Sequence, residues 1–155
     1  MRLVVGSDHG GFELKTTVID HLRAAGHEVA DVGTHGDASV DYPDYGAAVG
    51  RAVVSGSAEL GIAICGSGIG IAIAANKVPG VRAATVHDVT SARLSREHND
   101  ANVLCLGQRL TGPLVALDAV EVFLSTDFGH GRHEARVAKI AVLEQVATPV
   151  SARPA

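Results

Sequence analysis

The stretch that most constrains the fold of this chain runs from Leu60 to Lys77 and reads LGIAICGSGIGIAIAANK. The apolar run that ends at Cys65 predicts a buried strand, the glycine-rich segment after it a tight turn, and the Ala-rich run over 68–76 a helix. Loops of this kind lie at the carboxyl ends of parallel strands, where open α/β sheets bind ligands and helix N–H groups point toward anions. We therefore expect a ligand site around Cys65.

The same alternation of strand and helix continues along the rest of the chain. The expected strands cover residues 2–6, 28–32, 60–65, 82–86 and 102–106, and the expected helices cover 12–25, 45–54, 68–76, 88–97, 113–125 and 132–146. This order predicts a three-layer α/β fold with a parallel sheet. We expect one domain over residues 1–147 and a disordered tail over 148–155. The last helix has no sheet face left to cover, so we expect it to reach a second subunit.

Composition narrows the classes of protein that this chain can represent. Hydrophobic residues make up 46% of the chain, aromatic residues only 3%, and there is no Trp, so the core must consist of Val, Ile, Leu and Ala. A net charge of -4 argues against general affinity for nucleic acid or anionic membranes. We expect no membrane span and no signal peptide. Two cysteines in apolar runs fit reduced thiols in a cytoplasmic protein better than a disulfide framework.

Cys65 is the first candidate for chemistry. It precedes Gly-Ser-Gly at the start of an expected helix, whose positive end favours a thiolate. Two plainer interpretations stay open: a tight turn without a ligand, and an inert buried thiol. Cys105 lies in the middle of the last expected strand, and we assign it to the core.

Polar side chains follow two other expected elements. Asp8 and His9 lie in the loop after the first strand, and His98 and Asn99 end the helix before the fifth strand. Loop histidines are commonly just solvated, and the helix dipole favours a histidine at a helix C-terminus, so neither pair alone indicates chemistry. The chain has 8 His but no H-x-H, H-E-x-x-H or Cys-x-x-Cys spacing. We therefore expect no metal site.

Arg132 and Arg136 give a sharper signal. They are four residues apart in the expected last helix and so share one face near its N-terminus. Cations there oppose the helix dipole, which suggests a nearby anion such as a phosphate, although a solvated basic face is the plainer alternative. Arg109 adds a third cation after the fifth strand. A thiol, a glycine loop, two histidines and these arginines around one sheet edge predict proton abstraction from a small phosphorylated carbonyl compound.

Six blocks of the chain together resemble the type B ribose-5-phosphate isomerases, which belong with the galactose-6-phosphate and allose-6-phosphate isomerases. The blocks are GSDHGGFELK (6–15), DYPD (41–44), CGSGIG (65–70), AANK (74–77), REHNDANVL (96–104) and GRH with RV (131–133 and 136–137). The resemblance covers about residues 1–146. It implies a Rossmann-like fold with a five-stranded, mainly parallel sheet and an enzyme that interconverts D-ribose 5-phosphate and D-ribulose 5-phosphate through a cis-enediolate.

The resemblance also implies a role for each matching residue. Cys65 corresponds to the base that moves a proton between C1 and C2; some members use a glutamate a few residues later, but residues 69–72 here contain no acid. Ser67 and the loop N–H groups would stabilise the enediolate. His98 would open the furanose ring, with Asp8 beside it. The implied substrate contacts are Gly66, Gly68 and Gly70 in the loop, Tyr42 and Asn99 to sugar hydroxyls, and His9, Arg109, Arg132 and Arg136 to phosphate.

The resemblance further implies a homodimer or a dimer of dimers with the site between subunits, and no metal, nucleotide or other cofactor. Three alternatives stay open: an isomerase of a four- or six-carbon aldose phosphate, a non-catalytic module that binds a sugar phosphate or nucleotide, and a cysteine hydrolase. In a hydrolase His98 would activate the thiol, but the arginine pair would then lack a purpose.

Overall fold

The computed structural model describes residues 1–145 and shows five strands and six α-helices in alternation. The strands are β1 (Arg2–Ser7), β2 (Glu28–Asp31), β3 (Leu60–Cys65), β4 (Ala83–Thr85) and β5 (Val103–Gly107). The helices are α1 (Phe12–Ala24), α2 (Tyr42–Val54), α3 (Ile69–Ala75), α4 (Val89–Asn99), α5 (Pro113–Ser125) and α6 (Glu134–Gln145), with short 3₁₀ turns η1 (His9–Gly11) and η2 (Gly131–His133). The expected tail over 148–155 lies outside the described residues.

All four strand pairings are parallel, in the order β2-β1-β3-β5-β4, which confirms the expected sheet. The direction in which the chain adds strands reverses between β1 and β3. From β1 the chain passes to β2 at one edge of the sheet, and from β3 it passes to the side of β5 and β4 at the other edge. A crevice opens at the carboxyl ends of two strands at such a switch point, and ligands of doubly wound folds bind there. The residues that follow β1 and β3 therefore lie where a ligand would bind.

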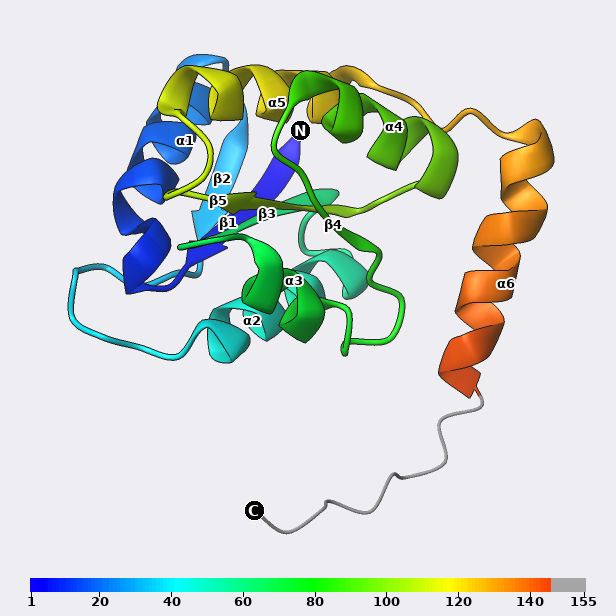
Figure 1. Ribbon diagram of the computed structural model, residues 1–155, viewed down its shortest axis with the longest axis horizontal. Helices are drawn as coiled ribbons and strands as arrows, with labels where there is room; N and C mark the ends of the chain where they lie inside the picture. Colours follow the sequence, from blue (N-terminus) through cyan, green and yellow to red (C-terminus); the bar gives the residue numbers. More distant parts are fainter. Residues whose placement is uncertain (146–155) are drawn as a thin grey trace, which may run out of the picture.

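Alternate residues of the central strands face two different helical layers. Ile62 and Ile64 pack in the cluster formed with α1, α4 and α5, whereas Ala63 and Cys65 pack in the cluster formed with α2 and α3. Figure 1 shows these two helical layers on opposite faces of the sheet. The second layer approaches closely because small residues line it: a Cβ on Gly61 would lie 2.7 Å from Val49 Cγ1.

Two helix starts differ from the expectation by more than one residue, and both differences move a candidate residue. Helix α2 begins at Tyr42 rather than Tyr45, since Pro43 fits the first turn of a helix. Tyr42 therefore lies on a helix and not in a loop. Helix α6 begins at Glu134, so Arg132 belongs to η2 and precedes the helix that was expected to carry it.

Helix α6 stands apart from the layered body of the molecule (Figure 1). Among the described elements its main packing partner is η2, and near its end Glu144 Oε1 accepts the Gly80 N–H at 2.9 Å. Apolar side chains remain exposed along it, with Leu143 at 71%. Its reaching a second subunit stays a prediction. None of the helices within residues 1–145 has the length and apolar character to cross a membrane.

Candidate active site

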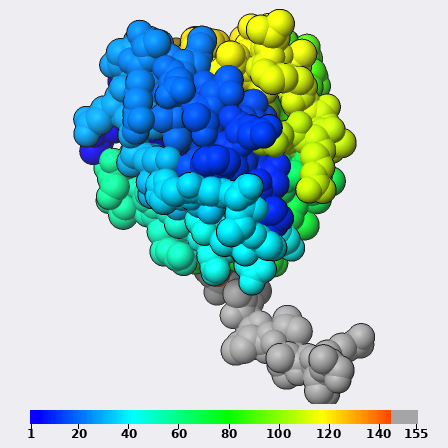
Figure 2. Space-filling view, turned by 90° about the vertical axis from the view of Figure 1, so that its left-hand side faces the viewer, coloured from blue at the N-terminus to red at the C-terminus, as the bar shows by residue number. Residues whose placement is uncertain are grey.

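A cleft of about 510 Å³ opens at the carboxyl ends of β1 and β3, which is the switch point of the sheet. Its volume falls in the range of small-molecule sites. Figure 2 faces this edge, where the blue segments after β1, the cyan loop before α2 and the yellow segment after β5 lie side by side. The cleft is lined by Asp8, Tyr42, Cys65, Gly66, Ser67, Ile69, Gly70, Arg109 and Leu110.

Cys65 is the last residue of β3 and forms part of the cleft wall, with 4% of its surface exposed. Its Sγ accepts the backbone N–H of Gly68 at 3.1 Å. Gly68 points this group at the sulfur because it adopts the left-handed conformation, with φ of 79°. We expected the positive end of the following helix to favour a thiolate. Helix α3 has only seven residues, however, and the favourable contact to the sulfur comes from this single N–H group.

Main-chain hydrogen bonds join the glycine loop, residues 66–70 and the end of β3 before it, to the loop after β5. Gln108 N donates to Cys65 O at 2.9 Å, and Arg109 N donates to Gly66 O at 3.0 Å. The Arg109 side chain then lies over Gly66, where an added Cβ would be 3.4 Å from its Nε. This arrangement places a cation on one wall of the cleft, beside the cysteine.

Tyr42 and Asp8 form the other walls. The Tyr42 ring packs on Gly70 so closely that a Cβ there would lie 2.7 Å from a ring carbon. Asp8 is 6% exposed, and its Oδ1 has no hydrogen-bond partner within residues 1–145. A buried carboxylate oxygen without a partner is costly, so a ligand hydroxyl in the cleft would satisfy it.

His9 lies at this same edge in η1, with its Nδ1 3.2 Å from the Val40 N–H. The loop that carries Val40 is itself anchored by Lys15, a buried residue whose Nζ binds both Asp31 carboxylate oxygens at 2.7 and 2.8 Å and Thr34 O at 2.8 Å. Sequence reasoning missed this ion pair. Its only signal was a lysine on the face of α1 that Val18 and Leu22 also use.

The remaining predicted residues lie elsewhere in the chain. Helix α4 connects β4 to β5, which are parallel, so it runs back against the strand direction and ends with His98 and Asn99 at the amino ends of the strands. A strand of six residues spans roughly 17 Å, which separates this edge from Cys65. Turn η2, with Arg132, lies beside the end of α4 (Figure 1). The expectation that all these groups surround one sheet edge is therefore wrong within one chain.

A second cluster forms at that opposite edge, and its central member was not among the candidates. His133 stacks on His98, with ring centroids 4.3 Å apart and planes 7° from parallel. Desolvation lowers the pKa of His133, and the charges of His98, Arg132 and Arg136 lower it further. Its signals in the sequence were its position next to Arg132 and its place in the GRH block over 131–133. The structure thus gives a thiol cleft at one edge and a cationic, imidazole-rich cluster at the other.

Cys105 is fully buried in β5, as expected for a core residue, and burial strongly raises the pKa of its thiol. Within residues 1–145 no three His, Cys, Asp or Glu side chains gather as metal ligands would.

Comparison with known proteins gives consistent similarities. The model of a family described as Ribose/Galactose Isomerase matches residues 3–140. Ribose-5-phosphate isomerase B of Escherichia coli is 44% identical over 144 residues, which covers 93% of this chain and 97% of that protein.

Solved structures are similar over the same extent. The ribose-5-phosphate isomerase B of Clostridium thermocellum superposes with a TM-score of 0.93 at 54% identity, covering 94% of this chain and 98% of that one. The enzyme of Mycoplasma genitalium, solved with bound ribulose-5-phosphate, gives a TM-score of 0.90 at 40% identity, with 94% and 97% of the two chains covered.

Proposed function

This chain belongs to the ribose/galactose isomerase family, and we propose that it is an aldose–ketose isomerase that interconverts D-ribose 5-phosphate and D-ribulose 5-phosphate. The observation that carries the chemistry is the cleft itself. It is lined by a cysteine sulfur that already accepts a backbone N–H, by a carboxylate with one oxygen that has no partner within residues 1–145, and by an arginine. These groups are the base, the hydroxyl acceptor and the anion partner that a phosphorylated sugar requires.

In the proposed reaction the Cys65 thiolate removes the proton from C2 of the open-chain aldose. The C–H electron pair forms the C1–C2 double bond while the carbonyl oxygen O1 gains negative charge. The hydroxyl proton then moves from O2 to O1, the electron pair left on O2 forms the C2 carbonyl, and the C1–C2 double bond takes the proton back from the Cys65 thiol at C1. The rate depends on stabilising that charge more than the bound sugar. Ser67 is suited to this task, because its Oγ accepts the Ile69 N–H at 3.3 Å and keeps its own proton to donate. The N–H groups of the loop over 66–70 would assist it.

The opposite locations of the two clusters support a site shared between two copies of the chain. A two-fold symmetric dimer would bring the thiol cleft of one subunit against His98 and Asn99 of the other, and would do so twice. In that arrangement His98 opens the furanose ring, with Asp8 of the facing cleft beside it. The exposed apolar side chains of α6 supply a surface for such a dimer, or for a dimer of dimers.

Substrate contacts divide between the two subunits in this proposal. Tyr42 of the cleft and Asn99 of the facing cluster bind sugar hydroxyls. The phosphate is bound by His9, Arg109, Arg132 and Arg136. Guanidinium groups suit this role because they donate two parallel hydrogen bonds to phosphate oxygens.

We further propose that residues 1–147 act as one sugar-phosphate isomerase domain, without a cofactor, in the cytoplasm. The two free, buried cysteines of the described chain support a reducing location.

A panel of aldose phosphates from four to six carbons, assayed for ketose formation with and without a chelator, tests the function. We expect the highest kcat/KM for ribose 5-phosphate and no effect of the chelator. Cys65→Ser should lower kcat by about 10²- to 10⁴-fold with little change in binding. A preferred six-carbon substrate, loss of activity with chelator, or binding without turnover by the unmodified protein would each contradict the proposal.

A further inference from the structure

We propose that Asp100 is a positioning residue for the isomerisation: bound between Arg82 and Arg96, its carboxylate fixes the end of α4 that presents His98 and Asn99. The inference rests on the proposed function, since it assigns a task to groups that touch no substrate and act through His98. We call Arg82, Arg96 and Asp100 the α4 clamp.

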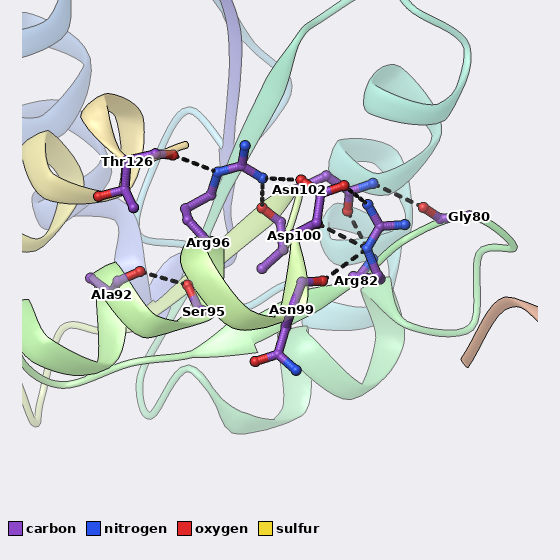
Figure 3. A network of polar contacts seen from close by, with 10 residues as sticks. Gly80, Arg82, Ala92, Ser95, Arg96, Asn99, Asp100, Asn102 and Thr126 are labelled. Carbon is purple, nitrogen blue, oxygen red and sulfur yellow. Dashed lines mark hydrogen bonds and ion pairs between the residues drawn. The ribbon is translucent and has the colours of Figure 1, made fainter. Parts of the chain in front are cut away.

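The clamp is a bridge in which each carboxylate oxygen has its own arginine (Figure 3). Arg96 Nη1 donates to Asp100 Oδ1 at 2.8 Å, and Arg82 Nη2 donates to Oδ2 at 2.7 Å. The side chains of Arg96, Arg82 and Asp100 are 14%, 25% and 34% exposed, so solvent screens these pairs less than surface pairs.

Arg82 also binds the main chain at the end of the helix. Its Nε donates to Asn99 O at 3.2 Å and to Asp100 O at 2.8 Å. Carbonyl groups in the last turn of a helix have no partner within the helix, and a cation there is favourable for the helix dipole. These bonds fix the peptide units around Asn99, and Asp100 holds the guanidinium that makes them.

Arg96 extends the clamp to the segment that carries the second imidazole. Its Nη1 donates to Ala101 O at 2.8 Å and its Nε donates to Thr126 O at 3.3 Å. Thr126 begins the connection to η2, which is also tied to α4 where Gly129 N donates to Glu97 O at 2.8 Å. The clamp therefore sets the distance between α4 and η2, across which His98 and His133 stack.

The backbone of Asp100 shows why an aspartate at this position needs an explanation. The residue adopts φ of 46° and ψ of 44°, the left-handed conformation that ends many helices. Glycine adopts this conformation with less strain than aspartate. Backbone conformation alone therefore gives no reason for an aspartate here, whereas the two arginines do.

The test compares two reactions of the same enzyme that differ in their need for ring opening. Isomerisation of ribose 5-phosphate starts from a closed furanose. Ribulose 5-phosphate has its O5 phosphorylated, so it cannot close a five-membered ring, and exchange of its C1 proton with solvent deuterium needs the thiol but no ring opening. If the clamp acts through His98, the first reaction must suffer more than the second.

We expect Asp100→Gly, which keeps the left-handed backbone, to lower kcat for ribose 5-phosphate by at least about tenfold. Exchange at saturating ribulose 5-phosphate should stay within about twofold of the unmodified protein, since the cleft is unchanged. In a His98→Asn background, Asp100→Gly should lower kcat for ribose 5-phosphate by no more than about twofold, because the effects of substitutions at residues that act as a unit are not additive.

Asp100→Asn keeps one acceptor oxygen and should lose less than Asp100→Gly. If the glycine variant does not fold, isomerisation and exchange are compared in Asp100→Asn instead. Glu121→Gln, which removes the carboxylate that pairs with His21 at 2.7 Å on another helix, is the matched control and should change neither reaction.

Equal losses in both reactions, an additive loss in the His98→Asn background, or an unchanged kcat for Asp100→Gly would overturn the positioning role. Unmodified protein that neither isomerises nor exchanges would instead overturn the proposed function, and this inference with it.

Discussion

At the scale of single residues, the two cysteines show how position in a strand decides whether a thiol reaches the cleft. Both lie in apolar runs of the sequence and both are buried. Cys65 ends its strand at the cleft and accepts the Gly68 N–H, whereas Cys105 lies inside β5, where burial and the neighbouring Cys65 raise the pKa of its thiol. The sequence was sufficient to separate them, because only Cys65 is followed by a glycine-rich turn.

This contrast predicts selective alkylation. Iodoacetamide should modify Cys65 of the native protein and leave Cys105 unmodified, since only a thiolate with access to the reagent reacts. Peptide mass spectrometry after a time course measures both sites. Saturating ribose 5-phosphate should slow the reaction at Cys65. Modification of Cys105 at a comparable rate in the native state would contradict this assignment.

His133 predicts how stability depends on pH. Its pKa is lowered in the folded state from an ordinary value of 6.5, so in the window below 6.5 the unfolded chain binds a proton that the folded chain does not. Stability should therefore fall as pH drops through that window. His133→Asn should lose less free energy of unfolding between about pH 7.5 and pH 5.5 than the unmodified protein.

Urea unfolding at both pH values and at matched protein concentration measures this difference. An equal loss of unfolding free energy in the two proteins would show that His133 does not contribute to the pH dependence of stability.

At the scale of elements, sequence reasoning succeeded where a local pattern determines the structure. The β-branched and apolar runs predicted all five strands, and the run over 60–65 matches β3 at both ends. It was less accurate at helix starts. Helix α2 begins at Tyr42 rather than residue 45, because Pro43 fits its first turn, and α6 begins after the turn Gly131–His133 rather than at residue 132. Pro43 is a local signal that favours the earlier start of α2, whereas the packing of Tyr42 on Gly70 and of η2 on α4 involves residues distant in the sequence, which no periodicity shows.

The glycine loop gives a prediction at this scale. Gly68→Ala should lower the free energy of unfolding by about 1–3 kcal/mol, since alanine at a φ of 79° is strained and its Cβ would lie 2.9 Å from Leu106 C. Urea unfolding measures the loss. Gly36→Ala is the matched control, because nothing lies within 4 Å of a Cβ there. Comparable losses in the two variants would argue against strain at the loop.

At the scale of the whole molecule, the parallel sheet separates the candidate residues into two groups at opposite edges. The residue patterns alone placed Cys65 and His98 around one sheet edge, although the family resemblance implied a site between subunits. Cys65 ends a strand, however, whereas His98 precedes one, and the parallel sheet puts these positions at opposite edges. His133 was given no role for a related reason, since only the folded chain brings η2 against the end of α4.

In the proposed arrangement a complete site needs two copies of the chain. Co-expression of Cys65→Ala and His98→Asn chains with different tags, followed by purification through both tags, isolates the mixed dimer. Each parent variant alone should be nearly inactive. The mixed dimer should recover about half of the wild-type kcat for ribose 5-phosphate, because one of its two shared sites keeps both residues. A mixed dimer no more active than its parents would show that each site lies within a single chain.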